Sequence, residues 1–129
     1  MTPQEEFMEV LVKTAEQDCS LDCRISLKEL SEENSLYAEL GVGFTNDTYY
    51  DKSTVKTFPV LFLCRNTDQS RCLGQLAEIC ENLQRRKVYP AGETFRWLDT
   101  IIAKEPSKIG RDEDGAYHYS CILNCKLFY

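Results

Sequence analysis

Cysteines are the residues of this chain whose type could do chemistry, and four of the seven form two pairs with equal spacing. Cys19 and Cys23 are four residues apart, and so are Cys121 and Cys125 near the carboxyl end. Together they could supply four zinc ligands, a disulfide framework, or neither. The local structure of each pair decides between these alternatives, because the sulfur atoms must converge.

Cys121 and Cys125 cannot converge if their segment is extended. Residues 116–129 alternate apolar and polar side chains with a period of two, which predicts a strand. Residues four apart on a strand lie about 13 Å apart, whereas two sulfur ligands of one zinc ion lie within roughly 4 Å of each other. Cys72 and Cys80, eight residues apart on a predicted helix, lie about 12 Å apart and fail in the same way.

Only Cys19 and Cys23 lie in irregular backbone that could bring two thiols together. A cytoplasmic thiol- or zinc-binding module that uses them is therefore an alternative function, although zinc needs four ligands and the single histidine, His118, is distant. His118 also faces away from Cys121 on the predicted strand, which disfavours cysteine–histidine catalysis. The other five cysteines replace small apolar residues and should be buried: Cys64, Cys72, Cys80, Cys121 and Cys125.

No catalytic constellation is recognisable elsewhere in the sequence. It contains no nucleophile elbow, phosphate loop or HExxH pattern. The acidic run at 112–114 lacks the alternating oxygen ligands and the final glutamate of a calcium loop. We therefore predict a protein that is not an enzyme and that binds no cofactor or metal.

Composition indicates one globular domain, residues 1–129. Hydrophobic residues make up 43% of the chain and charged residues 28%, and 129 residues can bury a core. The acidic amino terminus does not look like a signal peptide, and no apolar run is long enough to cross a membrane. The net charge of −6 disfavours nucleic-acid binding as the main function, because that affinity comes from cations that neutralise phosphates.

Two segments have the spacing of amphipathic helices. The first begins with a capping box formed by Thr2 and Glu5, with a proline between them. The second spans 66–87, is capped by Thr67 or Asp68, and places its apolar residues on one stripe. Gly74 interrupts this second helix, which suggests a tight contact there. A short helical turn is also indicated at 26–30 by a serine followed three residues later by a glutamate.

Four segments have the pattern of strands: 35–44, 55–65, 94–106 and 116–129. Gly41 and Gly43 indicate a bulge or a close backbone approach in the first. The second is apolar on both faces and should lie centrally, with Pro59 near its start. The order α-β-β-α-β-β predicts an α+β, two-layer fold: a mostly antiparallel four-stranded sheet with both helices on one face.

Two polar loops remain, at 45–54 and 107–115. The first carries two tyrosines and the second an aspartate–glycine turn signal. Solvated loops are the ordinary interpretation, but their aromatic and charged content makes assembly contacts a reasonable hypothesis.

Taken in order, these segments resemble a phage family of minor capsid proteins that is related to tail terminators. The resemblance covers most of the chain, and its middle portion carries the most weight. There a loop with a Tyr-Asp pair precedes a strand whose beginning contains Phe58-Pro59. The strand ends at Arg65, and a helix with a Leu-x-x-Ile motif follows. The chain departs from the family pattern in its cysteine content and in the glycine expected after Asp51, where Lys52 stands.

The resemblance implies a homohexameric ring at the head-proximal end of a siphophage tail, encoded by a phage or a prophage. The ring would stop growth of the tail tube and join head-completion proteins, and DNA would pass through an acidic channel without specific binding. The protein would then occupy the host cytoplasm during assembly and afterwards the virion, with no membrane contact. The resemblance places the assembly contacts in the two loops: Tyr49, Tyr50, Asp51, Lys52, Arg111, Asp112, Glu113 and Asp114.

Overall fold

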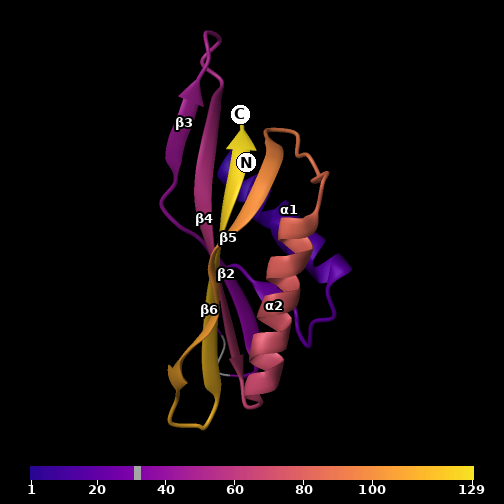
Figure 1. Cartoon of the computed structure of the whole chain (residues 1–129), viewed down its shortest axis with the longest axis vertical. Helices are drawn as coiled ribbons and strands as arrows, with labels where there is room; N and C mark the ends of the chain where they lie inside the picture. The colour runs from indigo at the N-terminus through magenta and orange to yellow at the C-terminus, as the bar shows by residue number, and fades with distance from the viewer. Residues whose placement is uncertain (31–32) are drawn as a thin grey trace.

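The computed structural model of the chain describes residues 1–30 and 33–129, and it contains two helices and one six-stranded sheet. The sheet order is β1-β2-β4-β6-β5, and β3 pairs with β4 beyond the end of β2. Both helices lie on one side of the sheet (Figure 1). The elements are α1 Pro3–Asp18, β1 Ile25–Ser26, β2 Ser35–Leu40, β3 Phe44–Thr48, β4 Thr54–Asn66, α2 Gln69–Arg85, β5 Arg96–Arg111 and β6 Tyr117–Phe128.

The predicted α+β, two-layer architecture is confirmed, with six strands in place of four. All strand pairs are antiparallel except β1 with β2. The added strands are β1 and β3. The predicted helical turn at 26–30 is wrong: the Ser26 hydroxyl accepts hydrogen bonds from the amides of Lys28 and Glu29, which forms a turn after β1. Residues 31–32 of the ambiguous segment 19–33 lie outside the described chain.

Helix α1 begins as the capping box predicts. The Thr2 hydroxyl accepts a hydrogen bond from the Glu5 amide, and Pro3 occupies the first helical position. The apolar face of the helix is buried against the sheet. Phe7 packs edge-to-face on Phe95 and on Trp97, with ring centroids 5.7 and 5.2 Å apart.

Asp68 caps the start of helix α2, and its carboxylate accepts a hydrogen bond from the Ser70 amide. Its predicted apolar stripe is buried, from Cys72 to Leu83. The tight contact predicted at Gly74 is wrong, because a Cβ atom built there would meet nothing within 4 Å. Gly74 therefore faces solvent.

The segment predicted as one strand at 35–44 is two strands separated by Gly41–Gly43. A Cβ atom on Gly41 would lie 2.8 Å from the Pro59 ring, and one on Gly43 would lie 2.4 Å from the Phe58 ring. The close backbone approach predicted for both glycines is thus confirmed. Before these glycines the chain pairs with β4 as strand β2, and after them it pairs with β4 as strand β3.

Val42 and Phe44 continue the two-residue alternation of the predicted strand 35–44, which places them on its apolar face, but both are exposed, Val42 by 92% and Phe44 by 57%. The break at the glycines carries them off the body of the sheet. Part of the predicted loop 45–54 is consequently the strand β3, and only residues 49–53 form the turn.

Strand β4 is central, as predicted, with β2 and β3 along one edge and β6 along the other. Pro59 lies in its middle instead of near its start. β2 pairs with β4 up to Val60 and β3 from Thr57, so Pro59 falls at the gap between them. The missing amide hydrogen of proline leaves no ladder bond unmade at such a gap.

Strand β5 extends farther than the sequence predicts. The prediction ended it at 106 and placed a loop at 107–115, but the strand continues to Arg111 and only a tight turn at 112–116 remains. Several register shifts along the β5–β6 pair accommodate the extra length. Two-residue periodicity is lost wherever such bulges occur, which explains the missed segment.

Candidate assembly surface

The two loops predicted to make assembly contacts lie at opposite ends of the molecule (Figure 1). β4 connects these ends: its first residues follow the loop at 49–53, and its last residues pair with the start of β6, after the turn at 112–116. Thirteen extended residues span about 40 Å. The structure therefore separates the two loops into two distinct surfaces.

The first surface belongs to the hairpin of residues 44–57, which we call the arm; its tip is the turn at 49–53. It consists of β3, the turn at 49–53 and the start of β4, and it projects beyond the rest of the molecule in Figure 1. Every residue of β3 is exposed. At the tip Tyr49 is half exposed and Tyr50 fully exposed. Large aromatic side chains in such positions are typical of protein interfaces.

Hydrogen bonds within the arm hold its shape without help from the helices. The Tyr49 amide donates to the Ser53 carbonyl oxygen at 2.9 Å, and the Lys52 amide to that of Tyr49 at 3.0 Å. The Asp51 carboxylate accepts from the amide and hydroxyl of Ser53, and these bonds lower the pKa of Asp51. The tip is therefore preorganised.

Lys52 adopts a backbone conformation that side chains rarely accept. Its φ is 73°, in the left-handed region, and it is the only residue other than glycine with positive φ in the described part of the chain. This is the position where the family pattern led us to expect a glycine. The sequence departure and the backbone strain thus fall on one residue.

A groove of about 350 Å³ lies between the first half of α1 and the edge of the sheet. Apolar atoms dominate its floor, and acidic side chains stand around it. None of those carboxylates forms an ion pair with any described residue. Its apolar lining, called the floor below, comes from Met8, Leu27, Tyr37, Ala38 and Leu40, Gln4 also lines it, and the carboxylates belong to Glu5, Glu9 and Glu39.

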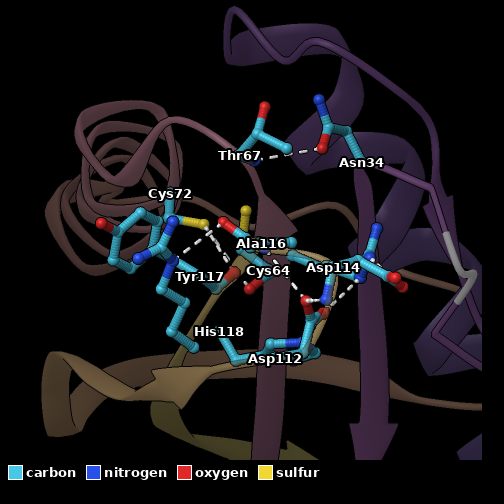
Figure 2. Close-up of polar contacts among 12 residues, drawn as sticks. Asn34, Cys64, Thr67, Cys72, Asp112, Asp114, Ala116, Tyr117 and His118 are labelled. Carbon is cyan, nitrogen blue, oxygen red and sulfur yellow. Dashed lines mark hydrogen bonds and ion pairs between the residues drawn. The ribbon is translucent and has the colours of Figure 1, made fainter.

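The second surface is organised by Asp112. Its carboxylate oxygen Oδ2 lies 2.9 Å from Nε of Arg65 and 2.8 Å from Nε2 of His118, and Oδ1 accepts from the amides of Asp114 and Ala116 (Figure 2). The hydrogen bond to His118, followed by those to Ala116 and Arg65, holds the pKa of Asp112 well below its usual range. Asp112 thus fastens the turn to β4.

Most of the charged residues predicted as contacts at this end have partners within the chain. The Arg65 guanidinium also lies 3.6 Å from the Asp114 carboxylate. The Arg111 side chain lies over the Tyr117 ring and donates to the Gly115 carbonyl oxygen at 3.3 Å. Glu113 is exposed at the tip and has no ion-pair partner in the described chain. Sequence reasoning missed the Arg65 and His118 contacts, because nothing in the local pattern pairs residues on different strands.

The cysteines behave as the strand and helix geometry predicts. All five that were expected to be buried are buried, and β6 is extended through Cys121 and Cys125. The two thiols of α2 approach the sheet: the Cys72 sulfur lies 3.6 Å from the Cys64 carbonyl oxygen (Figure 2), and the free thiol of Cys80 lies beside the free thiol of Cys121. Sequence spacing within one element could not have indicated these contacts between layers.

Cys19 and Cys23 lie beside a shallow pocket in the segment after α1. Burial raises the pKa of Cys19 to about 11 and raises that of Cys23. Metal binding requires the thiolate, so both environments are unfavourable for it. Among residues 1–30 and 33–129, no group of three or more potential ligands gathers at one place.

Comparison with protein families connects this architecture with a known class. A family model described as bacteriophage tail terminator protein matches residues 16–129. The chain belongs to this family. As a tail terminator it is a structural protein of a phage virion and interacts with other tail and head proteins. A search of curated proteins gives no significant match. In the described part of this tail terminator, neither helix is long and apolar enough to cross a membrane.

Proposed function

We propose that the protein is the subunit of a six-membered ring at the head-proximal end of a siphophage tail, as a tail terminator or minor capsid subunit of a phage or prophage. The ring stops growth of the tail tube and provides the surface that head-completion proteins bind. Family membership supports the tail location. Assembly takes place in the host cytoplasm, and the protein remains in the virion.

The observation that carries this proposal is the exposed arm. The exposed strand β3 pairs with the start of β4, which in turn pairs with the end of β6, so the arm is anchored to the sheet while its tip presents two tyrosines. Residues Tyr49, Tyr50, Asp51 and Lys52 form one assembly contact. Residues Arg111, Asp112, Glu113 and Asp114 lie at the other end of the sheet and form a second, in which Glu113 is the exposed charge without an ion-pair partner in the described chain.

Net charge supports the passage of DNA through such a ring. The chain carries a charge of −6, and an acidic wall repels phosphates, so the duplex slides without being held. We expect no specific DNA binding at physiological salt. A mobility-shift titration with duplex DNA measures this directly.

Negative-stain electron microscopy tests the ring. Purified protein is concentrated alone and, separately, mixed with tail tubes, because the tube can serve as the template on which the ring closes. Six-fold rings, or six-fold caps on tube ends, are the expected result. Monomers or two-fold dimers in both samples would contradict the proposal. Elemental analysis of the same sample tests the zinc alternative, which requires stoichiometric metal that is lost in Cys23→Ser.

A further inference from the structure

The arm and the acidic groove beside α1 are complementary surfaces of one molecule. We propose that the arm tip of one subunit docks in the groove of a second copy of the chain. The Tyr50 ring covers the apolar floor, and the Lys52 ammonium group lies among the three carboxylates. This inference rests on the proposed function, since it names the surfaces through which neighbouring subunits meet.

Charge identifies the partner of the groove. Glu5, Glu9 and Glu39 stand around it without ion pairs in the described chain, and no lysine or arginine lines it. Lys52 is exposed and likewise has no ion-pair partner there, whereas the neighbouring Asp51 carboxylate is engaged by Ser53. A cation on the arm without an ion-pair partner thus matches carboxylates around the groove that also lack one, of which only Glu5 accepts a side-chain hydrogen bond within the described chain, from the Thr2 hydroxyl.

Shape and apolarity agree with this pairing. The groove volume of about 350 Å³ lies in the range of pockets that receive compact ligands. Tyr50 is the most exposed large apolar residue described in the chain, so burying its ring gives a larger hydrophobic stabilisation than burying any of the others. A tyrosine flanked by a lysine therefore presents an aromatic anchor and a charge to an apolar floor with an acidic margin.

The strained backbone of Lys52 gives the docking an independent support. Glycine adopts a φ of 73° without strain, and lysine does not. A side chain kept at a strained position points to a function for that side chain. Here the lysine places a charge at the tip that a glycine could not supply.

An arm-to-groove contact joins two unlike surfaces, so it is heterologous and closes a ring or continues as a filament. Pairing through the free edge of β5 is another way to join subunits. Part of that edge is capped: the Gln84 side chain accepts from the Ile102 amide at 2.7 Å, and the Asp99 carboxylate accepts from the Thr100 amide at 2.9 Å. Capped amides do not template a further strand.

Charge reversal tests the docking in the full-length protein. Lys52→Glu and Glu39→Lys should each weaken self-association, measured by sedimentation and by occupancy of tube ends, by about tenfold or more. The double variant should recover most of the wild-type value, because the pair is restored with opposite polarity. Lys87→Glu makes the same charge change after α2, away from both surfaces, and should leave association unchanged.

Cross-linking shows which molecules meet. A carbodiimide joins amines to carboxylates in contact, and a mixture of ¹⁵N-labelled and unlabelled subunits distinguishes links between copies. We expect mixed-isotope links from the Lys52 peptide to peptides that contain Glu5, Glu9 or Glu39. Links from Lys52 only to tail tube protein, or only within one copy, would overturn the inference.

The outcomes also separate this inference from the proposed function. If Lys52→Glu and Glu39→Lys form rings as well as the wild type does, the proposed ring is supported and the docking is overturned. Absence of any assembly in the wild type, with tail tubes present, contradicts both. Lys52→Gly adds a further test, because it relieves backbone strain but removes the charge. It should weaken association while the monomer becomes more stable, and unchanged association would count against the docking.

Discussion

Lys52 and Gly115 occupy the same position in two turns of the same design. The Lys52 amide donates to the Tyr49 carbonyl oxygen at 3.0 Å, and the Gly115 amide donates to that of Asp112 at 3.1 Å. Both residues have positive φ, 73° and 85°. One turn thus has the residue that this conformation favours, and the other has a lysine.

This relationship predicts opposite effects of two substitutions. Lys52→Gly should raise the free energy of unfolding by roughly 0.5–1 kcal/mol, because the left-handed conformation no longer carries a side chain. Gly115→Lys should lower it by a similar amount. Urea denaturation of both variants and the wild type measures the difference. Loss of stability in Lys52→Gly would show that the lysine makes a stabilising contact within the monomer.

Gly74→Ala should stabilise the protein by about 0.5–1 kcal/mol. Alanine restricts the unfolded chain more than glycine does, and the added methyl group meets no atom within 4 Å. Gly43→Ala is the matched control, since its methyl group would overlap the Phe58 ring and should destabilise the fold. Thermal unfolding of both variants provides the comparison. A destabilised Gly74→Ala monomer would contradict the open position described for this residue.

Acid should weaken the end of the sheet that Asp112 fastens. Its pKa is lowered in the folded protein by His118, Ala116 and Arg65, so the unfolded chain takes up a proton more readily than the folded one. The stabilisation is therefore present above the ordinary carboxyl pKa of 3.8 and is lost as the pH falls below it. Unfolding midpoints from pH 7 to pH 3 should fall less steeply in Asp112→Asn than in the wild type. Equal slopes would show that this carboxylate does not contribute.

The thiols should react slowly in the folded protein. Burial raises the pKa of Cys19 to about 11 and that of Cys125 to about 12, which leaves little thiolate at neutral pH. Cys23 is the least buried of the seven and should be modified first by a thiol reagent at pH 7.5. The other six should react only after denaturation. Rapid labelling of Cys80 or Cys121 in native protein would contradict the packing of α2 on the sheet.

The helices and β6 could be predicted from the sequence because each buries one regular face. A period of 3.6 or 2 survives wherever one side of an element meets the core, as along Cys121 to Leu127. The capping of α1 by Thr2 could be predicted because it depends on neighbouring residues alone. Local signals of this kind need no knowledge of the sheet order.

The arm and the Asp112 contacts could not be predicted in the same way. β3 is exposed on both faces, so its side chains show no alternation that distinguishes a strand from a loop. Asp112 meets Arg65 only because the pairing of β6 with β4 places the turn at 112–116 beside the end of β4, and sequence separation hides that contact. The missing glycine at Lys52 was the one signal in the sequence for the strained tip. Only the backbone conformation of Lys52, with its positive φ, shows why a glycine is expected at this position.

Along one edge, strand β4 pairs with β3 over its first residues and with β2 over its last. The two ends of the molecule are therefore joined by a single stretch of backbone whose reach is fixed by its residue count. Removing two residues from it shortens that reach by about 7 Å and keeps every side chain on its own face, whereas removing one turns over all that follow. The length of this strand therefore sets the distance between the proteins that bind at the two ends of the molecule, and its thirteen residues determine that length.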